Sequence, residues 1–132
     1  MHTVTEAHGY RLLTVEGGTR LGSEADALEL INQAFNERAD AVAVPAEHVD
    51  DRFFELRSRV AGEVVLKFAG YRIRLVIVGD LSRHLAASES LAAFVRETNK
   101  GRDIWFVADH AELAARLRDQ AGTLGRSQGN LP

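Results

Sequence analysis

Arg57 and Ser58 stand side by side in the stretch ELRSRV, between apolar neighbours. A guanidinium binds carboxylates and phosphates, and a serine hydroxyl caps helices or carries a phosphate. In one continuous helix over residues 51–69, Arg57 would fall in the middle of the apolar side, where an unpaired cation is costly. We therefore expect a helix that begins with Ser58 as its N-cap, preceded by a separate turn or short helix over residues 51–56 that contributes Phe53 and Phe54 to the core.

This placement puts Arg57 at the mouth of a helix, beside free backbone N–H groups. An anion could bind there, Ser58 could be phosphorylated between two arginines, or the pair could be only a cap and a solvated side chain. Farther along, Arg59, Glu63 and Lys67 are spaced four residues apart and predict a row of ion pairs on the exposed side of the helix.

Asp80 and Ser82 form a second group, directly after the apolar run IRLVIVG. The carboxyl ends of parallel strands commonly carry ligand or catalytic groups, and an aspartate there equally often holds a turn. One hypothesis is therefore a small-molecule site or enzyme that also uses Glu63 and Arg102. Asp80, Ser82 and His84 do not predict a Ser–His–Asp triad, because residues so close in sequence rarely have that geometry and no Gly-x-Ser-x-Gly elbow is present.

A third group, Glu97, Asn99 and Arg102, surrounds the predicted end of a helix. Asn99 and Gly101 are typical of a helix C-terminus, whereas Arg102 precedes a buried strand and has no such explanation. Glu97 could pair with Arg102 or with Arg57, but only through a tertiary contact.

Strands and helices are predicted to alternate along the chain. Strands are expected at 10–16, 41–45, 73–78 and 104–107, and helices at 24–38, 58–69, 88–99 and 112–119. Alternation predicts an α/β fold with a four- to five-stranded, mostly parallel sheet covered by helices. Phe35 is expected on the inner side of the first helix, and Gly62 is expected to allow close packing. We expect one domain over residues 1–120 and a flexible tail over 121–132.

Composition narrows the classes of partner and cofactor. The 132 residues carry a net charge of −3. The basic stripe typical of nucleic-acid-binding proteins is missing, so we expect no nucleic-acid partner. No apolar run reaches the length of a membrane span, so we expect no membrane partner. The five histidines are scattered and there is no cysteine, so we expect no metal site. The glycines of VEGGTRLG lack the spacing and the lysine of a phosphate loop, so we expect no cofactor. The expected protein is cytoplasmic and binds a protein partner, itself or a small anion.

The run DDRFFELRSRVAGEVVLKFAGYRIRLVIVGDLS, followed by FVRETNKGRDIWFV, resembles a bacterial family known as domain of unknown function 4180. The resemblance covers residues from about Tyr10 to Leu117 and implies no particular activity. The residues that carry it are Phe53, Phe54, Leu56, Arg57, Ser58, Ala61, Gly62, Glu63, Lys67, Gly79, Asp80, Glu97, Asn99, Gly101 and Arg102.

More distantly, the chain resembles the sulfate transporter and anti-sigma antagonist (STAS) fold, in which a phosphorylatable serine opens a helix. Ser58 has a similar place, although Leu-Arg-Ser-Arg stands where that fold usually has Asp-Ser-Ser-Gly. This resemblance implies a small regulatory or interaction module.

Overall fold

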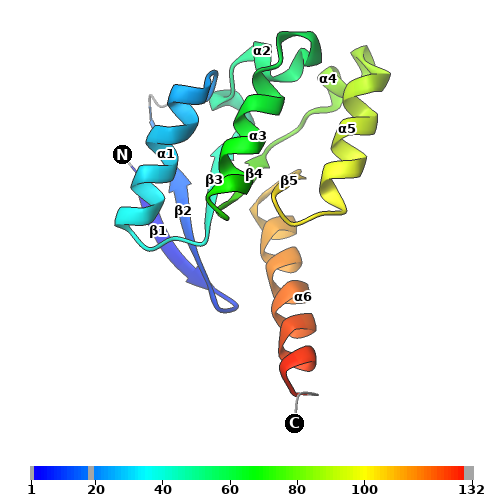
Figure 1. Ribbon diagram of the computed structural model, residues 1–132. Helices are drawn as coiled ribbons and strands as arrows, with labels where there is room; N and C mark the ends of the chain where they lie inside the picture. Colours follow the sequence, from blue (N-terminus) through cyan, green and yellow to red (C-terminus); the bar gives the residue numbers. More distant parts are fainter. Residues whose placement is uncertain (1, 18–19, 130–132) are drawn as a thin grey trace.

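The computed structural model describes residues 2–17 and 20–129, with side chains as far as residue 120 (Figure 1). The strands are β1 (His2–Ala7), β2 (Tyr10–Val15), β3 (Ala41–Pro45), β4 (Arg74–Val78) and β5 (Ile104–Val107). The α-helices are α1 (Glu24–Asn36), α2 (Asp51–Phe54), α3 (Val60–Gly70), α4 (Ser82–Ala87), α5 (Glu89–Asn99) and α6 (His110–Gly129), and two 3-10 turns are η1 (Ala46–His48) and η2 (Leu56–Ser58).

One five-stranded sheet forms the centre of the fold, with the strands in the order β1-β2-β3-β4-β5. Strands β2 to β5 are parallel and β1 is antiparallel to β2, which confirms the predicted α/β class. Because each parallel strand is placed beyond the previous one, right-handed crossovers put α1, α3 and α5 on the same face. These three helices lie side by side in Figure 1.

Strand β1 is absent from the predicted strands. It joins β2 through a two-residue turn at His8 and Gly9, whose φ angles are 53° and 85°, as a type I′ hairpin requires. The hydrophobic pattern of β1 is weak because Val4 is its one residue that packs against the main core. The sequence HTVTEA therefore lacks the apolar run that marks the other strands.

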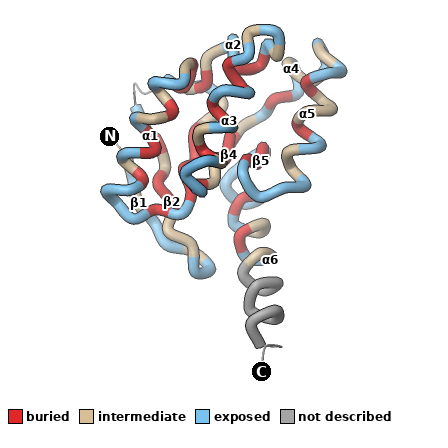
Figure 2. The backbone as a smooth tube through the Cα atoms, viewed as in Figure 1, coloured by how far each residue is buried: buried red, intermediate tan, exposed pale blue. Residues whose placement is uncertain are grey.

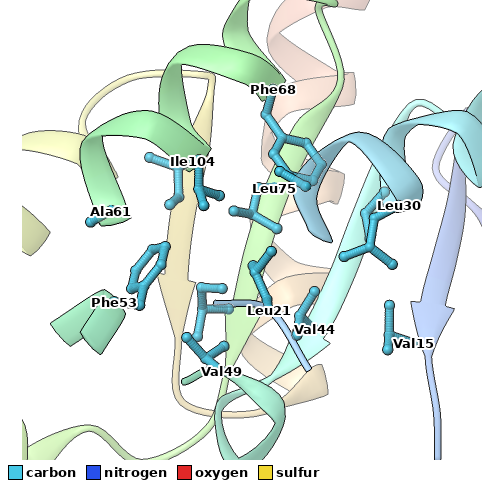
Figure 3. Packing of buried hydrophobic residues seen from close by; sticks show 14 of the residues in the cluster. Val15, Leu21, Leu30, Val44, Val49, Phe53, Ala61, Phe68, Leu75 and Ile104 are labelled. Carbon is cyan, nitrogen blue, oxygen red and sulfur yellow. The ribbon is translucent and has the colours of Figure 1, made fainter. Parts of the chain in front are cut away.

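The main core lies between the sheet and the helices, as Figures 2 and 3 show. Val44 of β3, Leu75 of β4 and Ile104 of β5 lie beneath Phe68 of α3, and Leu30 of α1 closes the cluster on the β2 side. All five side chains are buried. Their types explain the strand predictions, since β-branched and leucine runs fit a sheet that is covered on both faces.

Helix α1 begins as predicted, because the Ser23 Oγ accepts a hydrogen bond from the Asp26 N–H at 3.1 Å. The inward orientation expected for Phe35 is wrong. Phe35 is 51% exposed and makes an edge-to-face contact with Tyr71, with ring centroids 5.8 Å apart. Ala34 takes the inner position instead, and the next residue is rotated by about 100° around the helix axis.

The other face of the sheet is covered by α6 through Leu113 and Leu117, which pack with Trp105 of β5. The guanidinium carbons of Arg74 and Arg116 lie 4.1 and 4.2 Å from the indole ring centroid. The Trp105 Nε1–H donates to the Gly101 carbonyl at 2.9 Å. We call Trp105, Arg74, Arg116, Leu113 and Leu117 the Trp105 cluster.

In this cluster the two arginines also bind backbone carbonyls at the α5–β5 corner. Arg116 donates to the carbonyl of Asn99 and Arg74 to the carbonyl of Arg102, both at 2.6 Å. Burial is the main cause that lowers the pKa of Arg116 from its usual value. The cluster thus satisfies the carbonyl of Asn99 at the end of α5, which lacks a helical partner, and the carbonyls of Gly101 and Arg102 in the loop before β5.

Helix α6 continues to Gly129, well beyond the predicted end at Asp119. Residues 130–132, the last part of the predicted flexible tail, lie outside the described residues, so that flexibility stays a prediction. No helix in the described ranges, α6 included, combines the length and the apolar character that crossing a bilayer requires.

Candidate functional site

The break predicted near Arg57, in place of one continuous helix over residues 51–69, is present in the structure. Helix α2 ends at Phe54, the η2 turn follows, and α3 begins at Val60. Phe53 and Phe54 are buried, whereas Arg57 is exposed. One detail of the prediction is wrong: the N-cap of α3 is Arg59, with a φ of 66°, and not Ser58.

Ser58 nevertheless serves the first turn of α3. Its Oγ accepts a hydrogen bond from the Val60 N–H at 3.2 Å and donates one to the carbonyl of Arg52 in α2. The hydroxyl therefore connects the two helices across the η2 turn. A phosphoryl group on this oxygen would remove the proton that Arg52 accepts, so the geometry gives Ser58 a structural role.

Arg57 opens onto a surface pocket of about 920 Å³ between two segments of the chain. We call this pocket the α2–α4 groove. One side is formed by Asp51, Phe54, Glu55, Leu56 and Arg57, and the other by Arg83, His84, Ala87, Ser88 and Ser90. The rings of Phe54 and His84 are stacked in it, with centroids 4.2 Å apart and planes inclined by 20°.

The groove carries charges of both signs. Within the part of the chain that the structure describes, the side chains of Arg57 and Arg83 make no hydrogen bond or ion pair. Asp51 and Glu55 line the same groove and balance the formal charge. Such a polar, open surface can complement another protein's charges, and it offers a bare anion less net attraction than a purely cationic pocket would.

A second pocket of about 720 Å³ lies at the carboxyl ends of β3, β4 and β5 and shares Asp51, Phe54, Arg83 and His84 with the groove. Asp80 and His110 also line it. The Asp80 Oδ1 accepts a hydrogen bond from the Ser82 N–H at 2.9 Å.

The hydroxyl and the N–H of Ser82 both lower the pKa of Asp80. Asp80 thus holds its own turn into α4, which is the structural alternative considered for this residue.

The predicted ion-pair row on α3 is wrong. The Lys67 Nζ lies 3.1 Å from the Glu24 Oε1 on α1, so Lys67 joins two packed helices and does not pair with Glu63. Glu63 is exposed on α3 and lines neither the groove nor the pocket beside Asp80. The expected packing at Gly62 is also wrong, because a Cβ built there would meet no atom within 4 Å.

Glu97, Asn99 and Arg102 lie away from the groove. Arg102 precedes β5 and Asp80 follows β4. Because these strands are parallel, Arg102 lies at the amino ends of the strands and Asp80 at the carboxyl ends, so the two residues do not come together. The Glu97 Oε1 lies 3.2 Å from the Lys100 Nζ, so Glu97 pairs with a neighbour on its own helix end and not with Arg102 or Arg57, the two partners considered from the sequence.

Asn99 closes the free edge of β5 with its side chain. Its Oδ1 accepts a hydrogen bond from the Phe106 N–H at 2.7 Å, and its Nδ2 donates to the Phe106 carbonyl at 3.2 Å. The amide thereby replaces a neighbouring strand at this position. Asn99 is therefore a structural residue, because both polar atoms of its amide bind the backbone of Phe106.

We expect Asn99→Ala to lower the free energy of unfolding by about 1–3 kcal/mol, because it leaves the N–H and the carbonyl of the buried Phe106 unpaired. Asn99→Asp keeps an acceptor for the N–H and should lose less. Urea denaturation measures both, with Lys100→Ala on the exposed side as a control within about 0.5 kcal/mol of the parent. An Asn99→Ala midpoint equal to that of the control would contradict the role of the amide.

Sequence reasoning missed Arg83, Ser88 and Ser90 as groove residues and considered His84 only for a triad. A signal for them exists. Strands β3 and β4 are parallel neighbours, so the segments that follow them both start at the carboxyl ends of the strands and lie close together. Arg57 follows β3 and Arg83 follows β4, so both residues are expected near the carboxyl ends of these strands.

Comparison with known proteins agrees with the resemblance noted from the sequence. A model of the family described as "Domain of unknown function (DUF4180)" matches residues 8–117. Searches of curated proteins and of solved structures found no match. Since the match covers most of the chain, including the α2–α4 groove and the Trp105 cluster, the protein belongs to the DUF4180 family.

Proposed function

We propose that this protein is a small regulatory or interaction module that binds a protein partner in the α2–α4 groove. One observation carries the proposal: Arg57 and Arg83 come from two separate segments, line the same groove, and have no neutralising partner within the described residues. A guanidinium free of internal contacts can form a bidentate pair with a carboxylate or phosphate of a partner.

The rest of the groove supports a protein partner over a bare anion. Asp51 and Glu55 would repel a free phosphate, but they can pair with basic side chains on a partner. The stacked Phe54 and His84 rings supply apolar area between the charges. The groove is also formed by short helices and turns that a rigid sheet positions, where binding surfaces are commonly found.

The relationship to the STAS fold, the bacterial origin and the cytoplasmic location belong to the same proposal. The STAS part of this proposal is supported by the place of Ser58, which lies directly before α3, the helix that follows β3 and the short η1, α2 and η2 segments. The alternative of an enzyme at Asp80 has less support, since the Asp80 carboxylate is engaged by Ser82.

Charge reversal in the groove tests the proposal. Tagged parent protein, Arg57→Glu and Arg83→Glu should be purified from cells of the source organism, and bound proteins quantified by mass spectrometry. We expect at least one protein that the parent binds to fall by about tenfold or more with both variants.

Arg118→Glu is the matched control, because Arg118 is exposed on α6 and does not line the groove. Partners should remain bound to this variant. An identical set of bound proteins for the parent, the groove variants and the control would refute the proposal.

A further inference from the structure

Among the strands in residues 2–17 and 20–129, β1 is the outermost, so one of its sides has no neighbouring strand (Figure 1). The direction of its backbone groups follows from β2. The Arg11 carbonyl accepts a hydrogen bond from the Asp40 N–H at 2.7 Å, on the side of β3. Tyr10, Leu12 and Thr14 therefore face β1, since backbone groups alternate along a strand.

The outer edge of β1 thus belongs to alternate residues. Thr3, Thr5 and Ala7 stand opposite Thr14, Leu12 and Tyr10 and bond to β2. The N–H and carbonyl groups of His2, Val4 and Glu6 then point outward, and within the described ranges they make no hydrogen bond.

Of the usual devices against pairing, this edge carries one charged side chain, Glu6. Natural edge strands carry lysine, proline or a bulge that blocks a further strand. Strand β1 has neither lysine nor proline, and its register with β2 is continuous from His2 to Ala7. It is therefore a regular six-residue template for another strand.

The edge is complementary to itself. If a second β1 pairs antiparallel about a twofold axis at Val4, the three outward residues of each copy meet the three of the other: His2 opposite Glu6, Val4 opposite Val4, and Glu6 opposite His2. Each such pair exchanges two backbone hydrogen bonds.

Between these pairs, Thr3 comes opposite Thr5 of the other copy, and cross-strand threonine pairs are favourable. Glu6 already lies 3.0 Å from Arg11 through its Oε1, and its second carboxylate oxygen stays available for the imidazole of His2. A register shifted by two residues would lose one of the three pairs.

We propose that two copies of this chain associate through β1, in this register, to form one continuous ten-stranded sheet. A twofold axis perpendicular to the sheet keeps the α1–α3–α5 layers of both copies on the same face. The α2–α4 groove stays outside this interface, so the association is independent of the partner site proposed above.

Sedimentation equilibrium up to about 1 mM protein tests the association. We expect the parent to form dimers. Val4→Pro removes an outward N–H that the monomer does not use, and His2→Glu places carboxylates opposite each other at both ends. Each should weaken dimerisation by about tenfold or more.

Two further variants make the test specific. His2→Glu combined with Glu6→Lys restores opposite charges and should recover the dimer. His8→Asp adds an acid in the turn, outside the paired strand, and should leave dimerisation unchanged. Circular dichroism and the fluorescence of Trp105, the single tryptophan, report whether each variant is folded; if Val4→Pro is not, the charge series decides.

Two results would overturn the proposal. The first is a parent protein that stays monomeric throughout the concentration range. The second is a dimer that persists unchanged in folded Val4→Pro and His2→Glu, because that dimer would use another surface.

Discussion

Trp105→Ala should lower the free energy of unfolding by about 3–5 kcal/mol, the largest loss that we expect from a single substitution. The indole is fully buried, so its removal leaves a large cavity beneath α6. The guanidinium groups of Arg74 and Arg116 lose the ring that they cover, and the Gly101 carbonyl loses its donor. Urea denaturation followed by circular dichroism measures the effect.

Trp105→Phe separates these contributions. It keeps an aromatic ring between the arginines but has no N–H for Gly101, so we expect a smaller loss of about 1–3 kcal/mol. If both variants unfolded at the parent's urea midpoint, the Trp105 cluster would have no part in holding α6 against the sheet.

Gly79→Ala should lower the free energy of unfolding by about 2–4 kcal/mol for two separate reasons. Gly79 has a φ of 151°, a region that side chains other than glycine avoid. A Cβ there would also lie 2.7 Å from the Cβ of Ala46, and relief of such a clash requires the backbone to move.

Two comparisons isolate these causes. Gly79→Ala combined with Ala46→Gly removes the clash and should recover part of the loss, leaving the backbone strain. Gly62→Ala is the matched control, because its Cβ meets open space on α3; it should stabilise the protein by about 0.5–1 kcal/mol. A Gly79→Ala variant as stable as Gly62→Ala would contradict the close approach of β4 to η1.

Strands could be predicted from sequence where burial on both faces produces a continuous apolar run. The run IRLVIV predicts β4 for this reason, and its neighbours β3 and β5 follow the same rule. Strand β1 could not be predicted in this way, because an edge strand with one packed residue has no such run. Its existence depends on the turn at His8 and Gly9, which is a weaker local signal.

At the candidate site, the energetic cost of burying a charged side chain gave a better prediction than the expected side-chain partners did. The cost of burying Arg57 was sufficient to predict the break between α2 and α3. The cap was misplaced by one residue, since Arg59 takes a left-handed conformation that is uncommon outside glycine and asparagine. The partners of Lys67 and Asn99 come from other elements, α1 and β5, and a spacing rule along one helix cannot reveal them.

The order of the strands has a consequence for how the protein is made. Each strand of the sheet lies beside the strand that precedes it in the chain, so a polypeptide leaving the ribosome meets an already formed neighbour at every step. Helix α6, which packs on Trp105, emerges after all five strands. Until α6 has left the ribosome, the face of the nascent sheet that this helix covers stays exposed, and chaperones can bind there.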